Sequence, residues 1–370
     1  MPADTTVPAE TTVPPETTVP ADTTEARASA LPAPSHHTRR VGAYTNSAHR
    51  TRYLLVLGGL IVLAVVLVIL MLSWDNQHPP FSEKWWRISR MRSESLIVIA
   101  LVTLCHSFAT VAFQTATNNR LITPSIMGFE SLYILIQTAA VFFFGMSGLD
   151  QIDGFVQFLL QSAMMVLFAV ALYSWLFSGK LGNLHVMLLV GIIIGTGLGT
   201  LSTFLQRMLD PNEFDVLRAR MFGNVGNANT DYLWFVIPVC IVTAGSIWLL
   251  ARRLNVIALG SEISTNLGMD HKRQVMLTLT LVTVLMAMST ALVGPMTFLG
   301  FLVATLAYSI TDTHDHRRIL PVAWLLGFVV LAGAYFLLRH VLPMVDTVTI
   351  IVELIGGIVF LIVVLRRGRL

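Results

Sequence analysis

Residues 53–74 read YLLVLGGLIVLAVVLVILMLSW, a run of 22 residues without a charge. An α-helix of about 20 residues crosses the roughly 30 Å hydrocarbon core of a bilayer, so this run predicts a membrane-spanning helix. The whole chain of 370 residues has the same character, because 55 % of its residues are hydrophobic and only 12 % are charged. This composition excludes a soluble enzyme, whose surface needs far more polar residues.

Further apolar runs follow the first, separated by short polar loops. The third and the eighth are weaker, since they begin at Pro124 and Pro295, and proline at a helix start predicts half-helices that begin inside or near the membrane. The segment 122–129 is echoed by 293–301 five spans later, which indicates inverted repeats. The predicted fold is therefore an all-α polytopic membrane protein. Its ten candidate spans are 53–74, 95–115, 126–145, 155–177, 184–206, 232–251, 274–293, 296–310, 320–338 and 347–365.

The first 52 residues differ from the rest of the chain. A six-residue unit that contains a proline and an acid occurs three times between Thr5 and Asp22. Such a segment has too few apolar residues to offset the conformational entropy that it would lose on folding, and its prolines block helix formation. We expect residues 1–52 to be a disordered Thr/Pro-rich tail and residues 53–370 to form the membrane domain. Of the Lys and Arg residues flanking the spans, 15 fall on one side and eight on the other, which predicts that both termini are cytoplasmic.

The first outer loop departs from this charge rule. Residues 83–92 place Lys84, Arg87, Arg90 and Arg92 outside, which suggests an acidic partner.

No set of residues in the sequence forms a recognisable catalytic motif. The chain has no phosphate-binding loop of the G-x-x-x-x-G-K-[ST] type. Cys105 and Cys240 are expected to be small buried hydrophobes, and no metal or cofactor is predicted.

Three features inside the spans leave alternatives open. One face of the span 184–206 carries a stripe of glycines, Gly191, Gly195 and Gly199, with Thr196 and Thr200 beside it. This stripe either packs against another helix or lines a polar path, and packing is favoured. His106 and His185 are candidate haem ligands, although their unequal depth argues against a membrane cytochrome. Glu353 is interpreted as the one carboxylate at membrane depth, serving a proton-coupled carrier or helix packing.

The most informative loop runs from residue 255 to residue 273. A short amphipathic helix fits there between Gly260 and Gly268, with Ile263 and Leu267 on one face. Such a helix between two spans is suited to receive a push from a soluble motor. The residues predicted to couple this chain to an ATPase are Leu259, Gly260, Glu262, Ser264, Leu267 and Gly268.

At this loop the chain resembles the FecCD family, the permeases of ABC importers for iron-siderophores, haem and vitamin B12. The loop is similar to the family's L-G-x-x-x-x-x-x-L-G-[VM] motif, and the other matching segments occur in the family's order, in the variant of catecholate-siderophore permeases. These segments are 113–128, 293–301, 316–321 and Gly356-Gly357.

The resemblance implies a ten-helix permease of the type II ABC importer fold, without enzymatic activity of its own, in the inner membrane of a bacterium. Its cargo would be a ferric siderophore, with haem or a cobalamin-like chelate as alternatives. The implied partners are an ABC ATPase, an extracytoplasmic siderophore-binding protein, membrane lipid and a second permease, a heterodimer being favoured over a homodimer; no nucleic acid is implied. The binding protein would meet outward arginines, which match Arg92, Arg339 and the neighbouring Arg87 and Arg90. The expected translocation or packing residues include Pro124, Gly294 and Pro295, together with the stripe on span 184–206.

Overall fold

The computed structural model describes residues 47–74, 78–79, 82–149, 151–152, 154–178, 184–340 and 347–367. The chain divides into residues 1–42 and residues 43–370, and the first unit lies wholly outside the described residues. Residues 1–46 of the tail predicted for residues 1–52 therefore lie outside the part of the chain that the structure describes. Its last six residues are helical, because helix α2 begins at Ser47.

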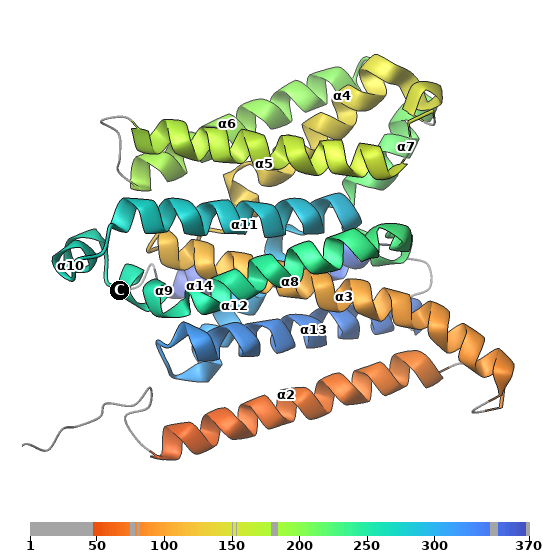
Figure 1. The fold of residues 1–370 in the computed structure, drawn as a ribbon. Helices are drawn as coiled ribbons and strands as arrows, with labels where there is room; N and C mark the ends of the chain where they lie inside the picture. The colour runs from red at the N-terminus through yellow and green to blue at the C-terminus, as the bar shows by residue number, and fades with distance from the viewer. Residues whose placement is uncertain are drawn as a thin grey trace, which may run out of the picture. The chain divides into compact units, whose positions relative to one another are not determined.

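Helices make up most of the described chain, and no strand occurs in that part (Figure 1). Eight helices are long and apolar enough to cross a membrane, and two shorter apolar helices lie at Phe129–Gly145 and Thr297–Thr311. These ten match the ten predicted spans, and the two short ones are those predicted as half-helices. The bounds are α2 Ser47–Ser73, α3 Glu83–Ala116, η1 Ser125–Met127, α4 Phe129–Leu149, α5 Gly154–Ser178, α6 Leu184–Gln206, α7 Pro211–Met221, η2 Val225–Asn227, η3 Thr230–Tyr232, α8 Leu233–Leu249, α9 Ala251–Ile257, α10 Ser261–Asn266, α11 His271–Val293, α12 Thr297–Thr311, α13 His316–His340 and α14 Val348–Arg367.

Helix α3 runs through the middle of the bundle and contacts α2, α8, α11, α12 and α13 (Figure 1). In its most apolar stretch of 18 residues 83 % are buried, against 6 % in α2. Its buried Thr103 and Ser107 hydroxyls donate to carbonyl oxygens four residues earlier in the same helix, so these small side chains pack without an unpaired polar atom. Helix α3 thus forms the core, whereas α2 lies at the edge of the bundle.

The prediction that residues 83–92 form a loop is wrong, because these residues are the first turns of α3. The Ser82 side chain caps this helix by accepting a hydrogen bond from the Trp85 amide at 3.2 Å. The charges that end the predicted span are compatible with helix as long as they lie beyond the hydrocarbon region. At 34 residues, α3 is longer than a single crossing requires.

Two helices begin deep in the bundle after a glycine with positive φ. Gly128 (φ 94°) precedes α4, and Gly294 (φ 97°) lies three residues before α12. The two starts meet, because the Thr297 hydroxyl donates to Oε2 of Glu130 at 2.6 Å. The helices do not begin at the prolines as predicted: Pro124 precedes the 3₁₀ turn η1 instead.

Glycines allow the backbone to pass close to both helix starts. A Cβ on Gly195 of α6 would lie 2.6 Å from the Gly128 Cα, and a Cβ on Gly191 would lie 2.6 Å from the Met127 Cε. On the other side, a Cβ on Gly356 of α14 would lie 2.5 Å from the Phe298 Cβ of α12. The two helix starts are therefore packed in matching ways, as expected for inverted repeats.

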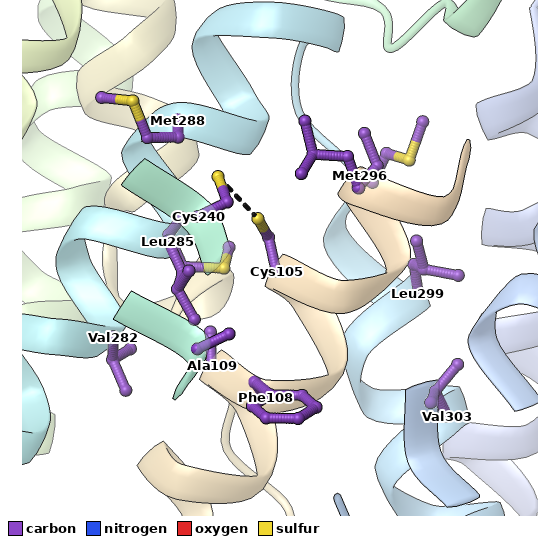
Figure 2. Close-up of a cluster of buried hydrophobic side chains, with 14 of the residues drawn as sticks. Cys105, Phe108, Ala109, Cys240, Val282, Leu285, Met288, Met296, Leu299 and Val303 are labelled. Carbon is purple, nitrogen blue, oxygen red and sulfur yellow. Dashed lines mark hydrogen bonds between the residues drawn. The ribbon is translucent and has the colours of Figure 1, made fainter. Parts of the chain in front are cut away.

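The expectation for the two cysteines is confirmed, since both are buried and free. The Cys105 thiol on α3 donates to the sulfur of Cys240 on α8 at 3.4 Å (Figure 2). Leu285 and Met288 of α11 lie beside the pair in the same cluster. The thiols thus fill the contact between α3, α8 and α11 as small apolar groups.

We expect Gly195→Ala to lower the free energy of unfolding by about 1–3 kcal/mol, because the added methyl group meets backbone that cannot rotate away. Gly197 is the matched control, since a Cβ there has nothing within 4 Å. Alanine at position 197 should be neutral or slightly stabilising, as expected within a helix. The measurement is the thermal unfolding midpoint of the purified variants, and equal midpoints would contradict the close approach.

Candidate functional site

The short helix predicted between α8 and α11 is α10, Ser261–Asn266. Gly260 at its start has φ 93° and ψ 170°, a conformation open almost only to glycine. Gly268 after its end has φ 81°, and a Cβ at either glycine would meet nothing within 4 Å. The glycines are therefore required by the backbone conformation at both ends of α10, not by crowding.

Helix α10 presents an apolar stripe to the surroundings. Leu259, Ile263 and Leu267 are 51 %, 50 % and 64 % exposed. Helix α10 lies outside the body of the bundle, at the end opposite to α7 (Figure 1). Ser264 on its other side is buried, and its hydroxyl is 2.7 Å from Nδ1 of His271, which ties α10 to α11. An exposed apolar stripe on a tethered helix is suited to bind another protein.

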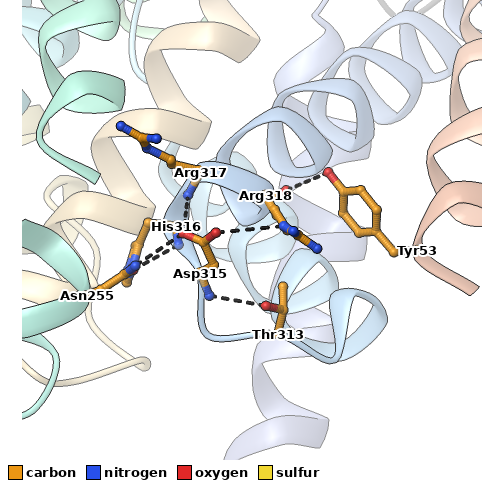
Figure 3. A network of polar contacts seen from close by, with 7 residues as sticks. All are labelled: Tyr53, Asn255, Thr313, Asp315, His316, Arg317 and Arg318. Carbon is orange, nitrogen blue, oxygen red and sulfur yellow. Dashed lines mark hydrogen bonds and ion pairs between the residues drawn. The ribbon is translucent and has the colours of Figure 1, made fainter. Parts of the chain in front are cut away.

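A polar network of Asn255, Asp315 and His316 joins α9 to the start of α13 (Figure 3). The Asn255 side-chain oxygen on α9 accepts from the backbone amide of His316 at 3.0 Å and is 2.6 Å from Nδ1 of the same residue. Nε2 of His316 is 2.7 Å from the Thr115 hydroxyl on α3. Because the Asn255 oxygen can only accept, Nδ1 carries the proton and Nε2 accepts from Thr115. His316 thus holds α9, α13 and α3 together.

The same network reaches α2. The Asn255 side-chain nitrogen donates to Oδ1 of Asp315 at 3.1 Å, and Oδ2 of Asp315 lies 3.7 Å from Nε of Arg318. The Tyr53 hydroxyl of α2 donates to the Arg318 carbonyl at 3.3 Å. A displacement of α9 would therefore reach three membrane helices, α3, α13 and α2. Asn255 lies in the loop 255–273 and His316 in the segment 316–321 that resembles the family, but nothing in the sequence pairs them.

The predicted outward arginines occupy two kinds of position at the α7 end. Arg87 and Arg90 are exposed on the first turns of α3. Arg92 is half-buried, and its Nη1 donates to the carbonyls of Met71 at 3.2 Å and Trp74 at 2.5 Å. Arg92 and Arg339 line one small recess, so residues from α3 and α13 are brought together. Arg92 therefore also fastens the end of α2 to α3.

The glycine and threonine stripe of α6 divides into two faces. Gly191 and Gly195 are buried against η1, whereas Thr196 and Thr200 are exposed. Gly199 is half-buried beside Ser131 of α4. One face thus packs, and the other offers hydroxyl groups at the surface of the bundle.

The prediction that Glu353 is the single carboxylate at membrane depth is wrong. The Thr297 hydroxyl lies 2.6 Å from Oε2 of Glu130 and 3.4 Å from Oε1 of Glu353. Glu130 lies within the predicted span 126–145, so the sequence already places a second carboxylate in a span. Its contact with Thr297 is visible only in the tertiary structure. The hydroxyl has a single proton, which serves Glu130, the nearer of the two acids, while Oε1 of Glu130 is buried without a hydrogen-bond partner.

The haem alternative has no geometric support in the described residues. His106 is buried in α3 among helices of the core, and the His185 side chain lies outside the described part. Among the described residues, no group of three or more His, Cys, Asp or Glu could hold a metal ion.

The comparison with known proteins decides the family. The model of the FecCD transport family matches residues 51–366, which extend from the first turns of α2 to the last turn of α14. The chain belongs to the FecCD transport family. The petrobactin import system permease protein FatC of Bacillus anthracis is 46 % identical over 335 residues, which cover 90 % of this chain and 95 % of that protein. The permease protein YclO of the petrobactin import system of Bacillus subtilis (strain 168) is 35 % identical, over 84 % of this chain and 96 % of that protein.

A solved structure has the same fold. It is an inward-facing conformation of a metal-chelate type ABC transporter, with a TM-score of 0.71 over 84 % of this chain and 99 % of that chain, at 22 % sequence identity. The predicted all-α membrane fold and the resemblance to the FecCD family are thus confirmed. This member of the FecCD family is a multi-pass membrane protein.

We expect Asn255→Leu to destabilise the α10 end of this FecCD protein by about 1–3 kcal/mol, because the buried His316 ring loses the acceptor of its Nδ1 proton. Asn266→Leu is the control, since Asn266 is exposed at the end of α10. The midpoint of thermal unfolding should fall for the first variant and not for the second. An unchanged midpoint for Asn255→Leu would show that the network adds no stability.

Proposed function

We propose that this chain is the transmembrane permease subunit of an ATP-driven importer that moves a ferric siderophore across the cytoplasmic membrane of a bacterium. The observation that carries the proposal is the 46 % identity to a petrobactin import permease along nearly the full length of both chains. The exposed apolar stripe on the short helix α10 fits a subunit that is driven by a soluble partner.

A separate ABC ATPase binds, in this proposal, to helix α10. Leu259, Ile263 and Leu267 supply an apolar contact, and the buried His316 network behind it carries displacement to α3, α13 and α2. Closing of the ATPase on nucleotide would then favour one arrangement of the membrane helices over another. This orientation places α10, α9 and both chain termini on the cytoplasmic side.

The second permease and the translocation path are placed along α6. Its exposed Thr196 and Thr200 are polar groups on a membrane helix, and a bulky chelate needs a path wider than one bundle provides. We assign this face to the contact with a second, different permease chain, as the family resemblance favours. The opposite glycine face of α6 holds the helix against η1.

The siderophore-binding protein docks, in this proposal, at the outer end of α3. Arg87 and Arg90 are the exposed cations there, and Arg339 lies at the recess that it shares with Arg92. Acidic groups on the lobes of the binding protein would meet these arginines. Because Arg92 also holds α2, charge reversal at Arg92 would disturb the fold, and it is unsuited to test docking.

A proton-coupled carrier is the alternative that Glu353 and Glu130 could suggest. Both acids lie at the Thr297 hydroxyl, and no basic side chain forms a salt bridge with either among the described residues. The identity to an import permease along nearly the full chain supports the ATP-driven importer over the carrier.

We expect Ile263→Asp to uncouple ATP hydrolysis from uptake, because a carboxylate replaces the centre of the apolar stripe on α10. Uptake into vesicles that contain the complete importer should fall on the order of tenfold, equivalent to about 1.4 kcal/mol of binding free energy. Thr265→Asp adds the same charge to the same helix away from the stripe and should transport normally. Normal uptake by Ile263→Asp would refute the assignment of α10 as the ATPase contact.

We expect the double variant Arg87→Glu and Arg90→Glu to weaken the binding protein on the order of tenfold at low salt, and less at high salt. The control variant, Arg253→Glu with Lys272→Glu, makes the same charge change at the α10 end and should leave the affinity unchanged. Affinity is measured by titrating the binding protein onto the importer in nanodiscs. Equal affinities of the two double variants at low salt would refute the docking site.

A further inference from the structure

Trp248 on the last turn of α8 lies against Arg317 on the first turn of α13. The central carbon of the Arg317 guanidinium is 5.5 Å from the centroid of the Trp248 ring, within the roughly 6 Å of a cation–π contact. Trp248 is 40 % exposed and Leu249 is 69 % exposed. Since α8 is long and apolar enough to cross a membrane, these side chains end a span, where tryptophan rings lie at the level of the lipid headgroups. The cation therefore lies at the boundary between hydrocarbon and headgroups.

The Arg317 guanidinium has no acidic partner in the part of the chain that the structure describes. Its Nε is buried without a hydrogen-bond partner, and it forms no salt bridge there. Asp315 accepts from the Arg317 backbone amide at 3.2 Å, but its charge faces Nε of Arg318 at 3.7 Å. Figure 3 shows the Arg317 guanidinium pointing away from both residues. A half-buried guanidinium with an unpaired N–H fits an oxyanion from outside the chain.

A second cation follows Trp248 by one helical turn. Leu250 joins α8 to α9 in the right-handed helical conformation (φ −76°, ψ −2°), so the spacing of a helix continues across it. Arg252, four residues after Trp248, therefore lies on the same side. Arg252 is exposed, and Asn255 one turn further contacts the start of α13. Helical spacing thus places Arg252 beside Trp248, on the side of α9 that faces Arg317.

The acids at this end of the bundle do not neutralise the two arginines. Neither Arg252 nor Arg317 forms a salt bridge among the described residues. The nearby aspartates that form salt bridges do so with other bases: Asp270 with Arg273, Asp312 with Arg52 and Asp315 with Arg318. Two unneutralised cations at the end of a membrane helix attract the phosphate of an anionic lipid.

The face of α8 that leads to Trp248 suits an acyl chain. Ile241, Gly245 and Trp248 follow one another at intervals of four and three residues, so they lie on one side of the helix. Ile241 is 57 % exposed, and a Cβ at Gly245 would meet nothing within 4 Å. This side of α8 is therefore apolar and open, and α8 is not the helix assigned above to the second permease.

We propose that Arg252, Trp248 and Arg317 form a binding site for an anionic phospholipid, with the lipid phosphate at the two guanidinium groups and an acyl chain along Ile241 and Gly245. The inference rests on the chain being a multi-pass membrane protein, and not on the cargo or the ATPase contact proposed above. The site adjoins the polar network of Figure 3, so the bound lipid would hold α8 and α9 against α13 at the α10 end.

The test measures lipid binding to the full chain in detergent by native mass spectrometry, with phosphatidylglycerol, phosphatidylcholine and glycerol 1-phosphate as matched probes. We expect phosphatidylglycerol to bind at least about tenfold more tightly than phosphatidylcholine, whose headgroup has no net charge. Glycerol 1-phosphate, which has the phosphate but no acyl chains, should not displace the lipid. Equal binding of the two lipids would overturn the proposal, and so would displacement by glycerol 1-phosphate, which would indicate a site for soluble phosphate.

Paired variants separate this site from the general positive charge of the α10 end. Arg252→Gln with Arg317→Gln should reduce the affinity for phosphatidylglycerol to about that for phosphatidylcholine. Arg253→Gln with Lys272→Gln removes the same charge from the same end and should keep the preference. A preference that survives in the first double variant, or that is lost equally in both, would overturn the proposal.

Tryptophan fluorescence locates the acyl chain without altering a charge. Phosphatidylglycerol with brominated chains, added at one equivalent, should quench the fluorescence of the wild-type chain and quench it less in Trp248→Phe. Trp86→Phe is the control, because Trp86 is equally exposed to solvent or lipid but lies on the first turns of α3. Undiminished quenching in Trp248→Phe would overturn the proposal. Loss of quenching when the ATPase is added would overturn it too, because the surface would then belong to the ATPase contact.

Discussion

The structure depends on the burial of two interrupted helices in a medium that cannot hydrogen-bond to backbone. Inside a bilayer, free N–H and C=O groups are tolerated only where protein covers them. The chain breaks at Gly128 and at Gly294, and it covers both breaks with helices that approach closely through glycine, α6 at the first and α14 near the second. A larger side chain at Gly195 of α6 or at Gly356 of α14 would push that helix away from the helix start that it covers.

This constraint places the remaining parts of the molecule. Helix α3 occupies the centre with the buried hydroxyls of Thr103 and Ser107 bonded within the helix, and it is long enough to reach both ends. Its first turns carry Arg92 and the exposed Arg87 and Arg90. Near its other end, the Thr115 hydroxyl lies 2.7 Å from Nε2 of His316. A single helix therefore links the surface suited to an acidic partner with the network behind α10.

Much of the fold could be predicted from composition and length alone. The ten apolar runs correspond to ten apolar helices, and the two weak runs to the two short ones, because the thickness of a bilayer sets the length of a span. The helix between Gly260 and Gly268 was equally predictable, since its boundaries are local. The start of α3 could not be predicted in this way, because charges end a hydrophobic run but not a helix. Glu130 lies in the predicted span 126–145, but its contact with Thr297 could not be predicted, because the depth of a half-helix depends on what covers it.

The sequence by itself determined the membrane helices, the family and the residue types at α10 and at the outer end of α3, because helix length, glycine conformation and charge are local properties. Only the tertiary structure decided which side chains act together. Asn255 and His316 lie 61 positions apart, Glu130 and Thr297 lie 167 apart, and Gln137 meets Gln161 across two helices. Such pairs depend on the distance and rotation between packed helices. No periodicity in the sequence records those quantities, so the contact of Arg317 with Trp248 could be recognised only in three dimensions.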